Sequence, residues 1–211
     1  MSVAEPTIEW KGTAGNNVWA GRGRTQKLAI VAHVMEGTIE GCAAWFANPA
    51  SKASANYGVA KDGRIWCFVD PTGPDAPFAN GLVQSPDDTV KNLIAAAGGD
   101  NLNFVTISIE HEGMSGEPLT AAQLDASGHL GAWLCERFGI RPDEEHLIGH
   151  YEIDSVTRAR CPGWNRAGWL AWERAIAGYL QPTDTPEVAD LKRRLGIAEE
   201  KLAAIAHVLQ S

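Results

Sequence analysis

The chain has 211 residues, of which 45% are hydrophobic and 21% are charged. This is an ordinary globular composition, and it excludes a disordered or low-complexity protein. The 18 Lys and Arg residues stand against 26 Asp and Glu residues, which gives a formal net charge of −8. That balance argues against a nucleic-acid binder, which usually has a basic face, and against electrostatic docking on anionic membranes.

No segment approaches the roughly 20 apolar residues of a transmembrane helix, so we expect no membrane insertion. The opening sequence, MSVAEPTIEW, has neither a basic nor an apolar segment, so we expect synthesis in the cytoplasm without a secretory signal. The four cysteines are widely spaced, at Cys42, Cys67, Cys135 and Cys161. They are too sparse for a disulfide scaffold, and we expect core residues with at least one available as a ligand or nucleophile.

The first elements in the chain are a strand and a helix. Residues 1–27 are rich in Gly, Asn and Arg, which is typical of irregular structure. The apolar run LAIVAHV at 28–34 predicts a buried strand. Residues 38–46 predict a helix that ends before Asn48-Pro49.

A hairpin and a second helix follow. The apolar runs 56–60 and 64–69 flank Asp62-Gly63, and Asp-Gly in that position predicts a hairpin. Residues 71–86 hold four prolines and two glycines and are expected to form a loop. Ser85-Pro86 would then open a helix, with Ser85 as its N-cap, that ends at Gly98-Gly99.

The remaining elements are two strands and two helices. Residues 104–109 predict a strand with alternate apolar residues on one face. Thr120 and Gln123 have the spacing of a capping box, which predicts a helix to about Phe138. Residues 147–150 predict a short strand, and Asn165 is placed to cap a last helix that extends to residue 180.

The composition changes at Gln181, so we divide the chain into a domain over 1–181, a linker over 182–186 and a C-terminal amphipathic helix over 187–211. Apolar residues of the last segment recur at heptad spacing over nearly three heptads: Leu191, Leu195, Ala198, Leu202, Ile205 and Leu209. This pattern favours a coiled coil that joins copies of the chain into a homo-oligomer. The alternative is an amphipathic helix folded back on the domain.

Three residues have the chemistry of metal ligands. His33 lies near the end of the first predicted strand. His150 follows the apolar residues Leu147 to Gly149 in the run LIGHYEID, and Cys161 is the first residue of CPGW, eleven positions after His150. Two imidazoles and a thiolate leave a fourth position for water, which is the pattern of a catalytic rather than a structural zinc site. Each residue alone also fits a buried structural role. A nucleophilic Cys161 is the rival chemistry, and it would need a histidine as base.

A carboxylate accompanies these residues. Glu110 falls at the end of the predicted strand 104–109, where it can accept a proton from a metal-bound water. Its alternative role is that of an exposed or salt-bridged carboxylate. His111 and Glu112 compete with it, and alternation puts Glu112 on the side of Glu110 and His111 on the other.

Five runs in this order resemble the type 2 N-acetylmuramoyl-L-alanine amidases, a zinc amidase family that includes phage endolysins and is similar to the peptidoglycan recognition proteins. The runs are HVMEG, NYGVAKDGRIW, NxNFVTISIEHEG, LIGHYEID and RxRCPGW, and they extend over about residues 25 to 180. The resemblance implies an α/β fold with a mixed central β-sheet flanked by helices and a zinc cleft over the sheet. It implies hydrolysis of the amide between N-acetylmuramic acid and L-alanine in peptidoglycan.

The resemblance also assigns roles to individual residues. It implies one Zn²⁺ per chain, held by His33, His150 and Cys161, with Glu110 as the catalytic carboxylate. The tyrosine that some members use is replaced by Ala55, so Glu110 would act without it.

Other positions depart from the family pattern. The lysine that many members have two residues before the third ligand is Ala159 here. Arg158 and Arg160 flank it, and we expect one of these arginines to replace the lysine, with Arg158 favoured. Asn56 and Asn80 stand where members often have histidine, and we expect them to contact the substrate. Trp164 follows the metal loop and would line the cleft.

The resulting hypothesis is a phage or prophage endolysin that waits in the cytoplasm and acts on the cell wall after release. The alternative is a non-catalytic peptidoglycan-binding or regulatory module on the same fold. All three metal ligands and the glutamate are present, which favours the enzyme.

Overall fold

The computed structural model describes residues 2–181 and residue 194, and the fold within Ser2–Leu180 is built on a mixed sheet of six strands. The predicted linker and coiled coil of residues 182–211 lie outside the described residues, residue 194 excepted. Among the described residues, no helix has the length and apolar character needed to cross a membrane.

The sheet has the strand order β1-β5-β4-β7-β3-β8. Its strands are β1 (Ile8–Trp10), β3 (Ala29–Val34), β4 (Tyr57–Val59), β5 (Ile65–Cys67), β7 (Thr106–His111) and β8 (Leu147–Gly149). Only β4 and β5 pair antiparallel, as the predicted hairpin, and all other neighbours are parallel. Two short strands, β2 (Val18–Trp19) and β6 (Ala76–Pro77), form a separate antiparallel pair.

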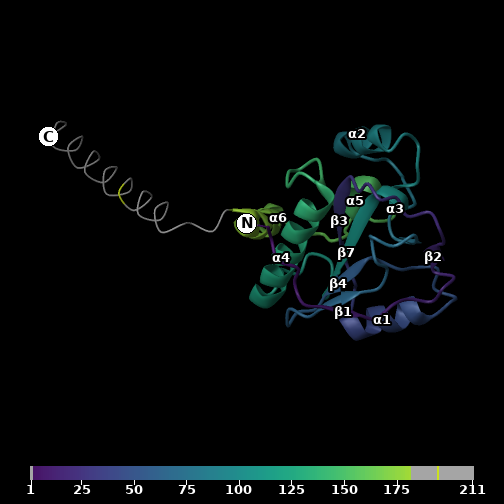
Figure 1. Cartoon of the computed structure of the whole chain (residues 1–211), viewed down its shortest axis with the longest axis horizontal. Coiled ribbons are helices and arrows are strands. Elements are labelled where there is room, and N and C mark those ends of the chain that lie inside the picture. The colour runs from purple at the N-terminus through teal and green to yellow at the C-terminus, as the bar shows by residue number, and fades with distance from the viewer. Residues whose placement is uncertain (1, 182–193, 195–211) are drawn as a thin grey trace. The chain divides into compact units, whose positions relative to one another are not determined.

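Within the described residues, six helices accompany the sheet, and Figure 1 shows their arrangement. They are α1 (Ile39–Ala47), α2 (Asp88–Ala96), α3 (Leu102–Val105), α4 (Ala121–Phe138), α5 (His150–Ile153) and α6 (Arg166–Leu180). Figure 1 shows α4 and α6 together on one side of the sheet, with α1 and α2 at opposite ends of the view. The predicted α/β architecture, a mixed sheet flanked by helices, is confirmed.

Alternation along the central strands divides the buried residues between the two faces of the sheet. On one face, Ile107 and Ile109 of β7 join the core formed with α4 and α6, which includes Leu130 and Trp172. The other face carries two separate apolar clusters. One joins β3 and β8 to α2, α3 and α5, and the other joins α1 to the region of β4 and β5.

Strand β7 lies between β3 and β4, and so between these two clusters. On this face it presents Thr106, Ser108 and Glu110, which alternate with its isoleucines. A polar strip therefore runs along this face of β7, buried at Thr106 and Ser108 and reaching Glu110 at the strand end. The predicted single apolar face of 104–109 is correct for Ile107 and Ile109, whereas Val105 belongs to α3 and to the opposite cluster.

Several predicted helix ends are confirmed. Thr38 caps α1, Thr120 caps α4, and the Asn165 side chain accepts a hydrogen bond from the Gly168 N–H at the start of α6. The capping box at Thr120 is only half formed. The Gln123 amide does not bond back to Thr120 but donates to the carbonyls of Val59 and Glu112, which ties α4 to the sheet.

Other expectations were wrong in detail. Residues 1–27 are not wholly irregular, since they contain β1 and β2, and the loop 71–86 contains β6. Asp87, not Ser85, caps α2 by accepting from the Val90 N–H, and Ser85 has a positive φ of 47°. A helix turn, α3, replaces the start of the strand predicted at Phe104, and His150 begins α5 instead of ending β8.

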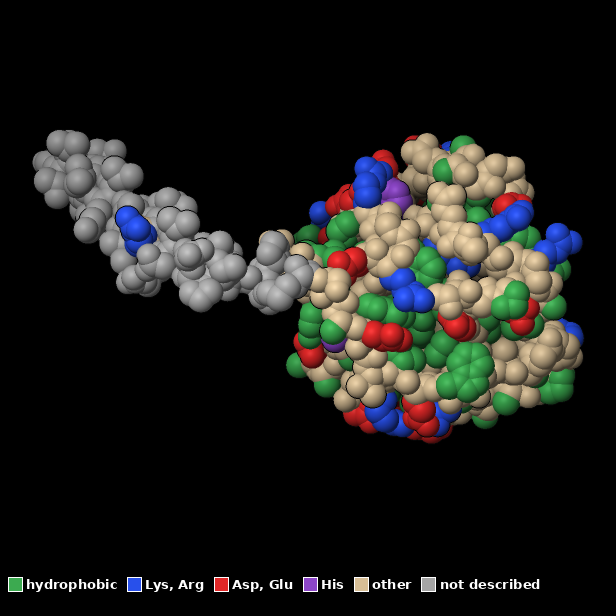
Figure 2. Space-filling view, viewed as in Figure 1, with side chains coloured by type: hydrophobic (Ala, Val, Ile, Leu, Met, Phe, Trp, Pro, Cys, Tyr) green, Lys and Arg blue, Asp and Glu red, His purple; other side chains and the backbone are tan. Residues whose placement is uncertain are grey.

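Charges are mixed over the surface of the domain. Figure 2 shows Lys and Arg side chains interspersed with Asp and Glu side chains on the visible face of the described domain. No broad area of a single charge is visible on this face of the described domain.

Candidate active site

Three predicted metal ligands, His33, His150 and Cys161, converge at the carboxyl ends of parallel strands. His33 on β3 lies opposite Glu110 on β7, and Ala32 lies opposite Gly149 on β8, so that His150 follows directly at the same edge. One nitrogen of each histidine and the Cys161 Sγ lie within 4.8 Å of one another. The carboxyl edge of a parallel sheet is where such folds place their ligands.

Glycines allow the two connecting segments to approach. A Cβ on Gly149 would lie 2.5 Å from the Tyr151 ring. Gly163 has a φ of 74°, and a Cβ there would lie 2.8 Å from the carbonyl oxygen of Arg160. Only glycine fits either position, so the GH and CPG sequences are steric requirements of the site.

The geometry of the three donors suits one metal ion. His33 Nδ1 lies 3.9 Å from Cys161 Sγ, and the rings of His33 and His150 are 4.3 Å apart between centroids. Nitrogen and sulfur ligands of one tetrahedral metal, with bonds of about 2.1 and 2.3 Å, are separated by about 3.6 Å. The His33–Cys161 pair is therefore within a few tenths of an ångström of the spacing that one tetrahedral metal requires.

The protonation states of the histidines also suit a metal. Burial lowers the pKa of His33 well below its ordinary value, with the neighbouring His150 adding to the effect. Burial lowers the pKa of His150 to about 4, and Arg158 acts in the same direction. Both imidazoles are thus neutral at pH 7, which leaves a lone pair for a cation.

Cys161 is poorly suited to act as a nucleophile by itself. Burial raises the pKa of its thiol to about 12, and the nearby Glu110 carboxylate contributes. Reactive cysteines instead have a depressed pKa, and a coordinated cation is what would stabilise the thiolate here. The structure therefore favours the ligand role over the rival nucleophile role.

Glu110 stands beside the three donors. Its Oε1 lies 3.9 Å from His33 Nδ1, and the side chain is 15% exposed. Its Oε2 is buried and has no hydrogen-bond partner among the described residues. Burial raises the pKa of the carboxyl to about 7, against the opposing effect of Arg158. A carboxylate with such a pKa can both accept and return a proton near neutral pH.

The two competitors of Glu110 have structural roles. Glu112 accepts a hydrogen bond from the Lys61 N–H. His111 is buried on the opposite face, where its Nδ1 contacts the His33 carbonyl and its Nε2 contacts Ser127 Oγ. Alternation correctly separated His111 from Glu110.

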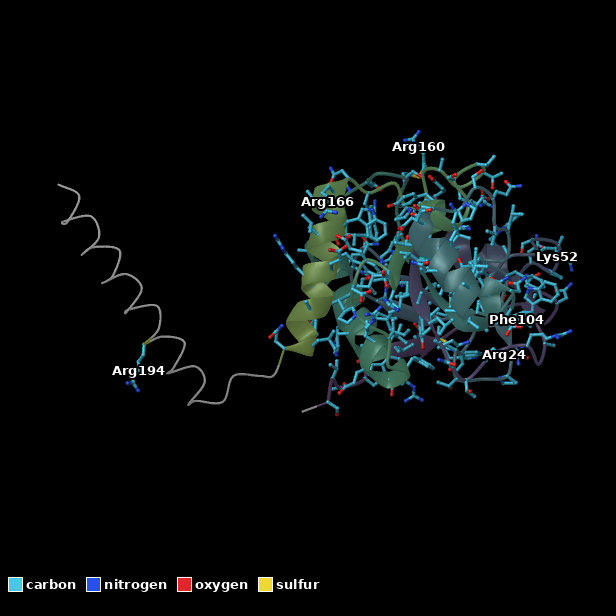
Figure 3. All side chains as sticks on the ribbon, turned by 90° about the horizontal axis from the view of Figure 1, so that it is seen from above. Arg24, Lys52, Phe104, Arg160, Arg166 and Arg194 are labelled. Atoms are coloured by element: carbon cyan, nitrogen blue, oxygen red, sulfur yellow. The ribbon has the colours of Figure 1, made fainter. Side chains whose placement is uncertain are left out.

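Arg158 belongs to a turn that Asp154 organises. The buried Asp154 accepts hydrogen bonds from the N–H groups of Val156 and Thr157. Its backbone carbonyl accepts from the Arg158 N–H, and the Arg158 carbonyl accepts from the Cys161 N–H. Arg158 lines the cleft, and its charge affects the pKa values of Glu110 and His150. The neighbouring Arg160 also lines the cleft, and Figure 3 shows its side chain at the outer edge of the domain.

A cleft of about 510 Å³ opens over these residues. Its walls come from α1 and from the segments at 34–38 and 53–54, as well as from the metal loop. Trp45 on α1 lines it while 55% exposed, and Cys42 lies one helix turn earlier. Only Ile39 and Phe46 of α1 are buried. The sequence analysis missed Trp45, although a tryptophan outside the helical stripe of these two residues was a usable signal.

Asn56 and Asn80 do not line the cleft, so the structure does not support their predicted substrate contacts. Both side chains are fully buried. The Asn56 amide donates to the Val69 carbonyl and accepts from the Ser108 N–H and hydroxyl, so it joins the hairpin to β7. Asn80 donates to the Thr106 hydroxyl.

Trp164 also lies elsewhere than predicted. It is 8% exposed and belongs to the core with α4 and α6, where it packs edge-on against His111, Trp169 and Trp172. Its exposed edge borders a second groove with Tyr151 and Trp169, not the cleft of His33.

Comparison with known proteins agrees with this site. A sequence model described as N-acetylmuramoyl-L-alanine amidase (Amidase_2) matches residues 23–164. N-acetylmuramoyl-L-alanine amidase A of Achromobacter lyticus is 30% identical over 118 residues, which are 54% of this chain and 55% of that protein. The chain thus spans about half the length of this curated relative.

Solved structures share the fold. A mutant endolysin from Bacillus subtilis superposes with a TM-score of 0.57 at 17% identity, over 81% of this chain and 98% of that one. The Escherichia coli amidase AmiD, in complex with anhydro-N-acetylmuramic acid-L-Ala-D-gamma-Glu-L-Lys, superposes with a TM-score of 0.54 at 19% identity, over 72% of this chain and 58% of that one.

Proposed function

This chain belongs to the N-acetylmuramoyl-L-alanine amidase family, and from that premise we propose that it is a zinc-dependent hydrolase of the amide between N-acetylmuramic acid and L-alanine in peptidoglycan. One observation carries the proposal. Two neutral imidazoles, a thiol and a carboxyl of raised pKa meet at one end of an open cleft.

The donor set supports zinc among the divalent metals. Two histidine nitrogens and one cysteine sulfur suit zinc, whereas calcium and magnesium prefer oxygen ligands. When bound by His33, His150 and Cys161, zinc would supply a Lewis acid that polarises the scissile carbonyl and lowers the pKa of water from 15.7 to about 7. One side of the site remains open to the cleft for that purpose.

Glu110 is the residue that moves protons in this proposal. Its carboxylate accepts a proton from the attacking water at the Oε atom that faces the cleft. The protonated carboxyl then donates that proton to the nitrogen of the leaving L-alanine. A pKa of about 7 allows both transfers, because neither protonation state is strongly favoured at neutral pH.

Arg158 stabilises negative charge in the same step. Its guanidinium is near enough to Glu110, His150 and Cys161 to affect the pKa of each. A tetrahedral oxyanion that forms beside these residues would gain from this fixed positive charge. The flanking Ala159 carries no such group, so Arg158 takes the role that lysine has in many members of the family.

Peptidoglycan is the substrate that best suits the cleft. The E. coli relative binds a muramoyl peptide, and the cleft here combines the Trp45 ring with Arg158 and Glu36. An aromatic ring can pack on a sugar face, and charged groups can orient a peptide. We further propose that the chain acts as a phage or prophage endolysin, made in the cytoplasm and acting on the wall after release, since solved relatives include endolysins.

The test is digestion of purified peptidoglycan by the full chain, with the released N-terminal alanine and the reducing ends both quantified. Amidase activity releases N-terminal alanine and creates no new reducing ends. Chelation should abolish it, added zinc should restore it, and Glu110→Ala should lack it. Glu40→Ala is the matched control, since Glu40 is an exposed carboxylate paired with Arg64 on the outside of α1.

Absence of alanine release from the zinc-loaded protein would contradict the enzymatic proposal. If that protein still sedimented with intact walls, the non-catalytic binding module would replace it. New reducing ends in place of alanine would instead indicate a glycosidase.

A further inference from the structure

The two nitrogens of the His33 ring have different surroundings. Nδ1 faces the site, 3.9 Å from Cys161 Sγ and 3.9 Å from Glu110 Oε1. Nε2 points into the protein, where it is buried without a hydrogen bond of standard geometry. A hydrogen-bond acceptor beside Nε2 would hold the proton on that nitrogen and leave the lone pair of Nδ1 free to bind a metal.

Asn80 is the residue on that side. Its side chain lies close enough to the His33 ring for a hydrogen-bonding interaction between the two. Its Oδ1 is also buried and, like His33 Nε2, lacks a partner of standard geometry among the described residues. The two unpartnered atoms thus belong to neighbouring side chains.

Thr106 fixes which end of the Asn80 amide faces His33. The Thr106 hydroxyl donates its single proton to the Leu102 carbonyl, 2.6 Å away, because a carbonyl can only accept. The hydroxyl oxygen can therefore only accept from Asn80, whose Nδ2 lies 2.9 Å from it. The amide must direct NH₂ toward Thr106 and Oδ1 away from it.

The backbone around Asn80 is held as firmly as its side chain. The Asn103 Oδ1 accepts hydrogen bonds from the N–H groups of both Ala79 and Asn80. Asn103 lies on α3, directly before β7, as Leu102 does. The loop that carries Asn80 and the strand that carries Glu110 are therefore fixed by one short segment.

We propose that Asn80 is a positioning residue for the metal site: its Oδ1 accepts the Nε2–H of His33 and so holds the ring in the tautomer that presents the Nδ1 lone pair to the ion. The chain of contacts runs from the Leu102 carbonyl through Thr106 and Asn80 to His33. It rests on the proposed function only in that the site binds zinc. Partners of this kind typically change metal affinity by about 10- to 100-fold.

Asn56 provides a matched control. It is also a fully buried asparagine whose amide meets a hydroxyl of β7, Ser108 in place of Thr106. Its remaining partner is the Val69 carbonyl, so its amide makes no hydrogen bond to His33. Asn56→Leu and Asn80→Leu thus each remove a buried amide from the same face of the sheet. The β7 hydroxyls that these amides contact, Ser108 and Thr106, are two residues apart on the strand.

The first measurement is the zinc dissociation constant of the full chain, by competition with a chromophoric chelator at fixed pH. Asn80→Leu should weaken zinc binding by about 10- to 100-fold, whereas Asn56→Leu should lower stability and leave zinc affinity within about threefold. Asn80→Asp, which retains an acceptor oxygen, should bind zinc more tightly than Asn80→Leu. Equal zinc affinity in wild type and Asn80→Leu would overturn the proposal.

The second measurement needs no variant to fold. Long-range ¹H–¹⁵N NMR of the full wild-type chain, with zinc and after chelation, should show His33 protonated at Nε2 in both states. If the tautomer changed to Nδ1–H on chelation, the metal and not Asn80 would set it, and the proposal would be wrong. Neither measurement depends on amide hydrolysis, so a protein that binds zinc but cuts no peptidoglycan would refute the proposed function and leave this inference standing.

Discussion

Glu110 and His111 are neighbours in sequence, both ionisable and both largely enclosed, yet they lie on opposite faces of β7 and are treated in opposite ways. Glu110 faces the cleft with one carboxylate oxygen lacking a partner among the described residues. His111 faces α4 and α6, and both of its ring nitrogens are hydrogen-bonded. Glu110 on one face thus has a carboxylate oxygen without a hydrogen bond, whereas His111 on the other face has both ring nitrogens hydrogen-bonded.

In the hydrogen-bond network around His111, groups that can only donate or only accept fix the position of every proton, as they do for Asn80 beside His33. The His33 carbonyl only accepts, so His111 Nδ1 carries the proton. The Trp172 Nε1–H only donates, so it fills an acceptor position of Ser127 Oγ, whose own proton goes to His111 Nε2. A fully satisfied buried network contributes to stability, whereas an unsatisfied carboxylate opposes it. The Glu110 face of β7 therefore serves function at some cost in stability, and the His111 face serves stability.

The sharpest way to break this contrast is Glu110→Gln. It keeps the shape of the side chain but removes the base, so kcat on peptidoglycan should fall by about 100- to 10,000-fold. Because burial of the carboxylate is unfavourable, the free energy of unfolding should stay the same or rise. Steady-state kinetics and urea denaturation of the same preparation test both parts. A large loss of stability would show that Glu110 is a structural residue after all.

Arg158→Ala should have the next largest effect, again on activity alone. Loss of the charge that stabilises the oxyanion should lower kcat by about 100-fold with little change in KM. Arg158→Lys should restore part of the activity, since it retains the positive charge. Arg166→Ala is the control, because Arg166 begins α6, pairs with Glu144 and does not line the cleft. If both alanine variants lost activity equally, a general effect of lost positive charge would replace the specific role of Arg158.

The parts of the fold that were predicted correctly are those with local signals. Asp62-Gly63 marks the β4–β5 hairpin, and Thr120 marks the start of α4. Strand β1 was missed because three residues are too few to display a period, and its partner β5 is distant in sequence. Ser85 was chosen as a cap for its residue type, but the helix begins only after Asp87, whose carboxylate accepts the Val90 N–H.

The site shows the same division. His33, Glu110, His150 and Cys161 were found because each belongs to a short motif whose order matches the family. The position of Asn80 beside His33 depends on how the loop that carries Asn80 packs against the His33 ring. No spacing in the sequence encodes that packing. The pattern Thr106, Ser108, Glu110 was visible as alternation, but only the paired sheet reveals that this polar face is buried.

On the opposite face, His111→Ala should act on stability alone. It removes two hydrogen bonds and part of the core beside Trp164 and Trp172. Unpaired Ser127 and His33 groups together with the cavity should cost about 3 kcal/mol of unfolding free energy. Urea denaturation measures the loss, and kcat per folded, zinc-loaded molecule should remain near the wild-type value. A kcat that fell as far as in Glu110→Gln would contradict the separation of the two faces.

The smallest expected effect is a dependence of stability on pH that comes from His111. Burial lowers the pKa of His111 to about 4, below the value of about 6.5 expected in the unfolded chain. Between about pH 6.5 and pH 4 the unfolded chain binds more protons at His111 than the folded protein does. The free energy of unfolding therefore falls as the pH falls. At pH 5 the loss attributable to His111 should be about 2 kcal/mol relative to pH 7. Denaturation of wild type and His111→Ala at both pH values isolates it, because contributions from His33 and His150 cancel in the difference. Parallel losses in the two proteins would mean that His111 is accessible to protons in the folded state, and that the satisfied face of β7 is less closed than its hydrogen bonds indicate.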